Sequence, residues 1–232
     1  MNTQNKIAFL GPEGTFSQTA VVNHFGKSSV LFDCASIEEV FLAVQHKRAN
    51  YGVVPVENST EGAVNNTQDC LINCTLSIVG EVIVPIIHHL LVRPGTAEAN
   101  ITKIASHKQS LAQCRQWILK SFPDVELVEC SSNAEASKLA SESATIAAIA
   151  GSLAAEVYGL EILRDKVHDQ HHNSTRFLVL SNSTKKPSGS DKTSVLIYAK
   201  NKPGALFRIL EPFESLRINL TKIETRPAKV EA

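Results

Sequence analysis

A run of polar residues that begins at Glu57 could bind or protonate a small molecule. It closes the apolar segment at residues 51–57, which is typical of a buried strand. Asn58, Ser59 and Thr60 offer hydrogen-bonding groups to a carboxylate or a hydroxyl. Glu57 could supply a proton if burial favours its neutral form. Capping of a following helix explains the same residues about equally well.

A second polar cluster enters the apolar strand that we expect at residues 176–180. Asn173 and Thr175 carry further hydrogen-bonding groups, and Arg176 follows them directly. A guanidinium at the mouth of a strand can bind a carboxylate through two parallel hydrogen bonds. An ordinary structural ion pair accounts for Arg176 equally well.

Three histidines close to this cluster raise the question of a metal site. His168, His171 and His172 lie near one another, and Asp169 is the one carboxylate at ligand spacing. Neighbouring side chains point in different directions, and the spacing matches no common ligand pattern. We therefore expect no metal.

A third cluster combines a glycine-containing turn with the start of a helix. Gly11 and Gly14 flank a turn that leads into Thr15, Phe16 and Ser17. Glycines let a backbone approach a ligand closely, and a helix N-terminus attracts anions. Local chemistry alone favours the simpler interpretation, in which Thr15 caps a helix that runs toward residue 26.

These clusters need a framework of strands and helices that brings them together. Short apolar runs alternate with helical patterns along the first 180 residues, which favours an α/β protein with a largely parallel sheet. In such proteins, strand-to-helix junctions bind ligands. The expected strands are 7–10, 51–57, one or two within 78–92, 127–130, 145–151 and 176–180. The expected helices are 15–26, 36–44, 62–73, 110–121, 153–158 and one that starts at Ser132.

Residues 181–192 differ in composition from the rest of the chain. They are nearly free of apolar residues and rich in Ser, Lys, Pro and Gly, as expected of a linker. Beyond it we expect a strand at 193–199, a helix at 205–216 and a strand at 218–225. Pro212 should kink or split that helix.

Composition favours a small-molecule partner in the cytoplasm. Lys plus Arg and Asp plus Glu number 23 each, so the formal net charge is zero, which excludes a strong nucleic-acid or anionic membrane footprint. No apolar run approaches the length of about 20 residues that a membrane helix needs. We expect no signal peptide at the N-terminus, and we expect the five scattered cysteines to be reduced thiols.

Six motifs, taken in order, resemble the prephenate dehydratase family. Four lie in the first part of the chain: GPEGTFSQ at 11–18, VVPVENSTEG at 53–62, SHKQSLAQC at 106–114 and NSTRFLVL at 173–180. Two in the tail, PGAL at 203–206 and INLTKIETRP at 218–227, resemble the family's ACT domain. The resemblance covers nearly the whole chain and is to the monofunctional enzymes.

The resemblance implies a fold of two parts. Residues 1–184 would form a periplasmic-binding-protein-like catalytic domain with a central cleft. Lobe one would take about 1–80 plus 174–184, and lobe two about 81–173. A linker at 185–192 would lead to a partial ACT domain, of the ferredoxin-like α+β class, at 193–232. An ACT domain is built βαββαβ, and these residues supply only the first three elements, so we expect a shortened domain with unpaired strand edges.

The resemblance also implies an activity. The chain would convert prephenate to phenylpyruvate in L-phenylalanine biosynthesis, without a cofactor. Thr175 would assist the departing hydroxyl, with Glu57 as a candidate proton source. Substrate would contact Asn58, Ser59, Thr60, Gln109, Asn173, Arg176 and Phe177. L-phenylalanine would be a possible effector, bound through Gly204, Ala205, Leu206, Glu224, Thr225, Arg226 and Pro227.

Two other functions fit the same residues. Arogenate, which carries an amine where prephenate has a keto group, could be the substrate instead. A non-catalytic amino-acid sensor would use the same cleft without turnover, although it would not need a hydroxyl donor at Thr175. The association of relatives implies a homodimer or homotetramer.

Overall fold

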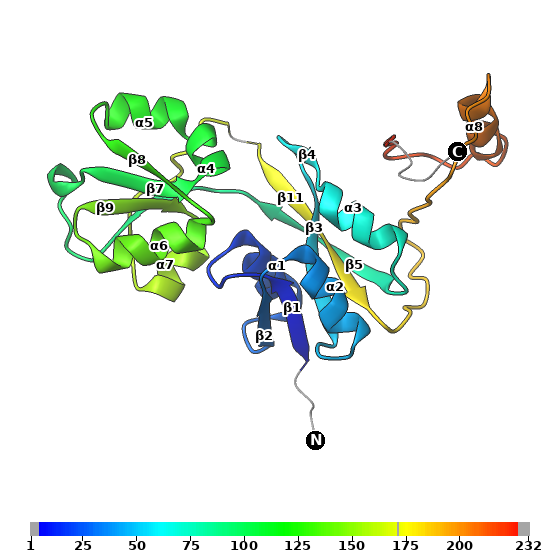
Figure 1. The fold of residues 1–232 in the computed structure, drawn as a ribbon, viewed down its shortest axis with the longest axis horizontal. Coiled ribbons are helices and arrows are strands. Elements are labelled where there is room, and N and C mark those ends of the chain that lie inside the picture. Colours follow the sequence, from blue (N-terminus) through cyan, green and yellow to red (C-terminus); the bar gives the residue numbers. More distant parts are fainter. Residues whose placement is uncertain (1–4, 171, 227–232) are drawn as a thin grey trace. The chain divides into compact units, whose positions relative to one another are not determined.

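The computed structural model describes residues 5–170 and 172–226, so His171 and Pro227 lie outside the described residues. The chain divides into two compact units, with the boundary between Lys186 and Pro187. The first unit contains two α/β lobes, each built on its own sheet (Figure 1). None of the described helices has the length and apolar character needed to cross a membrane.

The first lobe is built on a six-stranded sheet of order β2-β1-β3-β11-β5, with β4 paired to β3. Its strands are β1 (Lys6–Leu10), β2 (Val30–Cys34), β3 (Tyr51–Asn58), β4 (Gly62–Ala63), β5 (Ser77–Pro85) and β11 (Ser174–Ser181). Its helices are α1 (Phe16–Phe25), α2 (Ile37–Gln45) and α3 (Asn65–Ile72). The last strand, β11, returns from the other lobe and lies between β3 and β5.

The second lobe is built on a five-stranded sheet of order β10-β6-β9-β7-β8. Its strands are β6 (His89–Val92), β7 (Lys103–His107), β8 (Glu126–Cys130), β9 (Ile146–Ala150) and β10 (Glu161–Arg164). Its helices are η1 (Glu98–Asn100), α4 (Lys108–Gln113), α5 (Arg115–Ser121), α6 (Asn133–Glu142) and α7 (Ser152–Tyr158). The chain crosses between lobes after β5 and again before β11, so the first crossing follows Pro85 rather than residue 80.

Both sheets are mixed, and the expectation of a largely parallel sheet was wrong. Strand β11 runs antiparallel to both β3 and β5, and β6 runs antiparallel to β9 and β10. The reason is that the chain crosses between the lobes twice. A strand that returns from the other lobe enters the first sheet from the opposite end, and apolar runs buried on both faces carry no signal of direction.

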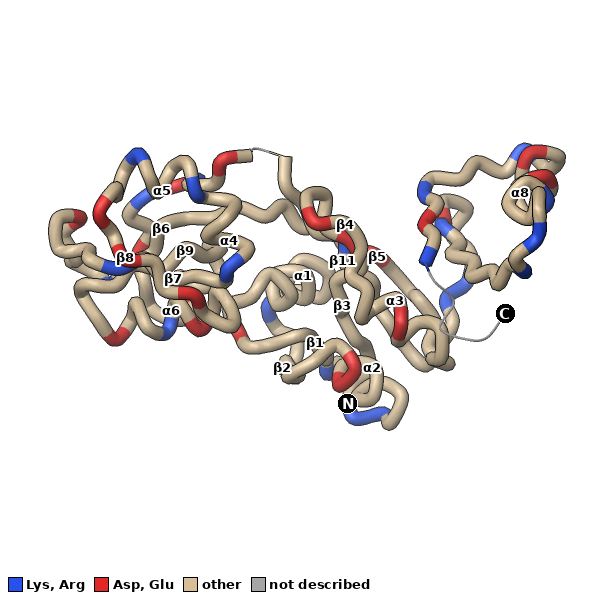
Figure 2. The backbone as a smooth tube through the Cα atoms, turned by 45° about the horizontal axis from the view of Figure 1, so that its top comes forward, with Lys and Arg blue, Asp and Glu red and all other residues tan. Residues whose placement is uncertain are grey.

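Each sheet is covered on both faces, which explains why its central strands are apolar throughout. In β1, Ile7 and Phe9 pack toward α1, whereas Ala8 faces the cluster that includes α2. Successive side chains of a strand point to opposite faces, so a strand between two helical layers needs apolar residues at every position. In Figure 2, basic and acidic residues lie interspersed over the two lobes.

The helix starts follow the capping residues in the sequence. Thr15, Ser36 and Ser132 each accept a hydrogen bond from the backbone three residues on, which confirms the three predicted N-caps. Two helix predictions need correction. The helix expected from residue 62 begins at Asn65, because Gly62 and Ala63 pair with β3. The helix expected at 110–121 is two helices, α4 and α5, which meet at Cys114.

The second unit contains one described helix, α8 (Ala205–Ser215), and no described strand. The strands expected at 193–199 and 218–225 were therefore wrong for this structure. A strand needs a neighbour for its N–H and C=O groups, and local β-propensity cannot supply one. Pro212 lies inside a continuous helix, so the expected split was also wrong. The helix is exposed there, and water can satisfy the carbonyl that Pro212 leaves unpaired.

Candidate active site

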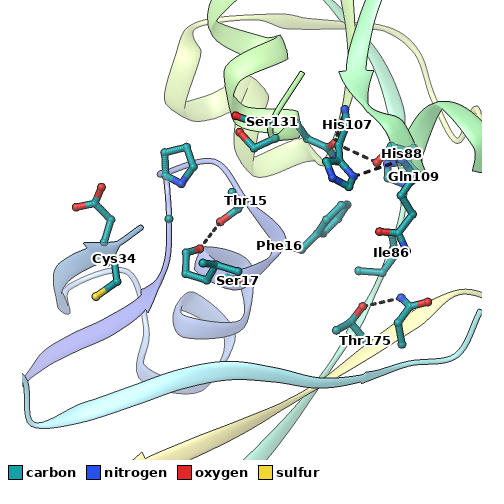
Figure 3. Close-up of a pocket in the computed structure, with 18 of the residues that line it drawn as sticks. Thr15, Phe16, Ser17, Cys34, Ile86, His88, His107, Gln109, Ser131 and Thr175 are labelled. Atoms are coloured by element: carbon teal, nitrogen blue, oxygen red, sulfur yellow. Dashed lines mark hydrogen bonds between the residues drawn. The ribbon is translucent and has the colours of Figure 1, made fainter. Parts of the chain in front are cut away.

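A cavity of about 820 Å³ lies between the two lobes of the first unit. Lobe one contributes the starts of α1 and α2, the end of β3 and the start of β11, and lobe two contributes the starts of α4 and α6. Figure 3 shows His107 and Ser131 on one side of this cavity and Thr175 on the other. The lining residues used below are Thr15, Phe16, Ser17, Asn58, His88, His107, Gln109, Gln113, Asn133, Asn173 and Thr175.

Thr175 and Asn58 form the centre of the lobe-one wall. They are paired residues on the antiparallel strands β11 and β3, so their side chains lie together on one face. Asn58 Nδ2 donates to Thr175 Oγ1 at 2.8 Å. Asn58 Oδ1 accepts the backbone N–H groups of Thr60 and Glu61 at 2.9 and 3.0 Å, which fixes the orientation of the amide. Thr175 Oγ1 is therefore an acceptor toward Asn58, and its own hydrogen is available to a ligand.

A chain of hydrogen bonds joins this pair to the second lobe. Asn58 Nδ2 also donates to Asn173 Oδ1 at 3.0 Å, and Asn173 Nδ2 donates to Gln113 Oε1 at 3.1 Å. His88 Nε2 lies 3.0 Å from the same Gln113 oxygen. An amide oxygen only accepts, so His88 must carry its proton on Nε2. The position of the Thr175 hydroxyl is thus tied to residues of both lobes and of the crossing segments.

His88 is a neutral residue in this network. Its side chain is buried, and burial is the main cause that lowers its pKa from 6.5 to about 4. The bond to Gln113 opposes this shift, whereas His168 and His89 add to it. The ring of Phe16 packs edge-on against His88, with centroids 5.5 Å apart. The Nδ1 atom is buried without a partner among the described residues.

None of the described residues that line the cavity is a lysine or an arginine. Its hydrogen-bonding groups are hydroxyls, amides, imidazoles, the carboxylates of Asp33 and Glu39, and the first turns of helices, where backbone N–H groups have no partner within the helix. Thr15 caps α1, Phe16 and Ser17 begin it, and His107 caps α4. An anion in this cavity would be held by neutral donors and helix N-termini.

Three residues predicted to contact substrate or donate a proton lie away from this cavity. Arg176 follows Thr175 on β11 and points to the other face, where it pairs with Glu57 at 3.3 Å and with Glu81 at 3.2 Å. Phe177 is only 2% exposed and belongs to the core of lobe one. The structure therefore places Arg176, Phe177 and Glu57 outside the cavity lining. Alternation along the strands turns Arg176 and Glu57 to the other face, whereas Phe177 lies further along β11, inside the core.

The remaining predicted residues divide between the cavity wall and its support. Asn58, Asn173 and Gln109 line the cavity with Thr175. Ser59 and Thr60 do not. Ser59 Oγ accepts the backbone N–H of Ser174 at 2.9 Å, and the Thr60 N–H orients Asn58. These two residues hold the end of β3 against the crossing segment rather than facing a ligand.

Sequence reasoning missed the roles of Gln113, His88 and Asn133 in this site. Gln113 lies in the SHKQSLAQC motif, and its distance of four residues from Gln109, one helical turn, could have suggested a shared face. His88 and Asn133 offered no such signal, because their partners lie far away in sequence.

In the second unit, the expected effector residues lie on both sides of α8. Gly204 precedes the helix with φ of 73°, a conformation that favours glycine, and Ala205 and Leu206 begin the helix. Glu224, Thr225 and Arg226 lie in the irregular segment that follows, where Glu224 pairs with Lys222 at 3.2 Å. Pro227 lies outside the described residues.

The first unit has two mixed α/β lobes, a chain that crosses between them twice, and a polar cleft. These features define a protein of the periplasmic-binding-protein-like class. A family model described as prephenate dehydratase matches residues 7–185, and one described as ACT domain matches residues 193–231. The chain belongs to the prephenate dehydratase family.

Relatives and solved structures agree with this assignment. The chain is 51% identical over 224 residues to a bifunctional chorismate mutase/prephenate dehydratase of Pseudomonas aeruginosa, covering 97% of this chain but 61% of that protein. It is 36% identical to a prephenate dehydratase of Mycobacteroides abscessus, covering 97% and 76% of the two chains. The crystal structure of prephenate dehydratase in complex with L-Phe from Arthrobacter aurescens matches with a TM-score of 0.83 at 32% identity, over 96% and 76% of the chains.

Proposed function

We propose that this chain catalyses the decarboxylation and dehydration of prephenate to phenylpyruvate, with Thr175 as the catalytic residue. One observation carries the proposal. The Thr175 hydroxyl lies in the wall of the interlobe cavity and accepts a hydrogen bond from Asn58 at 2.8 Å, so its hydrogen can be donated to a ligand. A fixed donor of this kind suits a substrate that must lose a hydroxyl group.

The chemistry of the substrate fits such a site. One carboxylate leaves as carbon dioxide, its electrons move through the ring, and the ring hydroxyl departs from the opposite carbon. The departing hydroxyl takes up one proton, so the products are phenylpyruvate, carbon dioxide and water. The ring becomes aromatic, which drives the step. The protein must orient a dianion and stabilise charge that develops on the leaving oxygen.

Thr175 polarises the leaving hydroxyl rather than giving up its proton completely, because an aliphatic hydroxyl is a weak acid. We do not assign Glu57 as the proton source, because it pairs with Arg176 away from the cavity lining. His88 is unsuitable at neutral pH, since its pKa of about 4 keeps it neutral and its Nε2 proton is held by Gln113. Water that enters the open cleft is the proton source that we propose.

The direct test is to add prephenate and follow phenylpyruvate by its absorbance in alkali, with arogenate assayed in parallel. The proposal expects phenylpyruvate from prephenate and much slower formation of phenylalanine from arogenate. Tight binding of either compound without product would instead support a sensor. Preferential turnover of arogenate would replace prephenate as the substrate.

We further propose that L-phenylalanine regulates this activity through the second unit. Support comes from the ACT-domain match at residues 193–231 and from the L-Phe named in the Arthrobacter structure. Gly204, Ala205 and Leu206 with Glu224, Thr225, Arg226 and Pro227 are the proposed contacts. A homodimer or homotetramer in the cytoplasm would suit a biosynthetic enzyme of this kind. Titration with L-phenylalanine during the prephenate assay, and sedimentation analysis of the same sample, test these points.

A further inference from the structure

Asn133 links the start of α6 to the start of α4 in the lobe-two wall of the cavity. It is the first residue of α6, it is partly exposed, and it lines the cavity. Its Oδ1 atom is within 3.2 Å of the backbone N–H of His107, 3.0 Å of Ser110 Oγ and 3.2 Å of Ser106 Oγ. One amide oxygen thus fixes the start of α4.

These contacts determine which end of the Asn133 side-chain amide is the oxygen and which is the nitrogen. A backbone N–H can only donate, so the atom that faces His107 must be the oxygen of Asn133. The NH₂ group is then the other end of the side chain. Among the described residues it has no hydrogen-bonding partner, and it is not among the buried unpaired atoms of the protein, so solvent reaches it. A donor of fixed orientation therefore remains on a residue of the cavity wall.

We propose that Asn133 Nδ2 binds the side-chain carboxylate of the substrate, the one that is retained in the product. This inference rests on the proposed function and adds a residue that sets substrate affinity. Among the described residues that line the cavity there is no lysine or arginine, and Asp33 and Glu39 are acidic, so the substrate carboxylates need neutral donors such as this amide. Figure 3 shows that the neighbouring Ser131 and His107 lie across the cavity from Thr175. A substrate that reaches both walls can place its hydroxyl at Thr175 and a carboxylate near Asn133.

The chemistry favours the retained carboxylate. The leaving carboxylate loses its negative charge in the transition state, so a strong hydrogen bond to it would stabilise the ground state and slow the reaction. The retained carboxylate keeps its charge throughout. A donor to that group binds substrate, transition state and product equally, and its loss should raise KM without lowering kcat.

The substitution Asn133→Asp distinguishes the binding of the substrate carboxylate from the structural role of Asn133 in fixing the start of α4. The carboxylate can still accept from His107, Ser110 and Ser106, and an acidic residue in the first turn suits α6. The substitution replaces the cavity-facing donor by a negatively charged acceptor. We expect an unchanged melting temperature, a rise in KM of about 10- to 100-fold and a kcat within about threefold of wild type. The inhibition constant of phenylpyruvate should rise by the same factor as KM.

Two further variants complete the test. Asn100→Asp is the matched control: it adds the same charge on the exposed helix η1 and should change neither KM nor kcat. If Asn133→Asp fails to fold, Asn133→Ser keeps a small polar group, lacks the amide donor, and should raise KM about fivefold. A wild-type KM in the folded variant overturns the proposal. A raised KM with unchanged phenylpyruvate inhibition also overturns it, because the carboxylate would then be the leaving one.

Calorimetric titration with phenylpyruvate distinguishes failure of this inference from failure of the proposed function. A wild-type chain that turns over no prephenate contradicts the function. Weaker phenylpyruvate binding to Asn133→Asp than to wild type would still support the carboxylate contact. Equal binding to the two proteins would overturn the contact, whatever the activity.

Discussion

His88 should make the protein sensitive to mild acid, and His88→Gln should remove much of that sensitivity. The folded protein keeps this imidazole neutral because it is buried, and its pKa falls from 6.5 to about 4. The unfolded chain therefore binds a proton between these two pH values that the folded protein does not bind. Stability is lost as the pH falls from about 6.5 and levels off, for this group, near pH 4.

The size of this loss in stability follows from the difference between the two pKa values of His88, 6.5 in the unfolded chain and about 4 in the folded protein. One pKa unit corresponds to about 1.4 kcal/mol, so the shift of His88 should cost about 3 kcal/mol of unfolding free energy between pH 7 and pH 4. His168 and His89 also lower the pKa of His88, so the comparison must be made between wild type and the variant rather than within one protein. Glutamine can still donate to Gln113 but cannot bind a proton.

Urea unfolding at pH 7 and pH 4 measures this effect. We expect wild type to lose about 3 kcal/mol more than His88→Gln over that interval. His46→Gln, which changes an exposed histidine, should behave as wild type. Parallel losses in wild type and His88→Gln would refute the reasoning, because they would show that His88 is not kept neutral by burial.

Two further predictions concern residues outside the cavity. Arg176→Met should lower stability by about 1 kcal/mol through loss of its two partly exposed ion pairs, and should leave KM for prephenate unchanged. Thermal unfolding measures the stability, and initial rates measure KM. A large rise in KM would restore Arg176 as a substrate contact. Gly14→Ala should destabilise by about 1 to 3 kcal/mol, because φ is +87° and a new Cβ would lie 2.8 Å from the ring of Tyr158. Gly26→Ala, with φ of +84° and open space around it, should cost less in the same unfolding assay.

Local sequence patterns predicted the elements well where local interactions decide them. The caps at Thr15, Ser36 and Ser132 depend on contacts within four residues, and all three were confirmed. The strands expected at 193–199 and 218–225 carried equally suitable residues and did not form. Their stability depends on neighbours that local propensity cannot supply.

The site was predictable in part for the same reason. Asn58 ends β3 and Thr175 lies at the start of β11, which pairs with β3, and both residues line the cavity. Arg176 could have been excluded from the sequence, because two consecutive residues of a strand cannot face the same cleft. Asn133 could not have been found, since its role depends on an amide orientation set by His107, which is 26 residues away in sequence.

The most direct measurement of the central claim is kcat for prephenate in Thr175→Val beside Thr175→Ser. Valine keeps the shape of threonine and lacks the hydroxyl, whereas serine keeps the donor. The hydrogen-bonding pattern around Asn58 predicts that Thr175→Val loses about 100-fold or more in kcat, with a folded structure, while Thr175→Ser keeps a large part of it. Wild-type kcat in folded Thr175→Val would contradict the assignment of Thr175 as the group that assists the leaving hydroxyl.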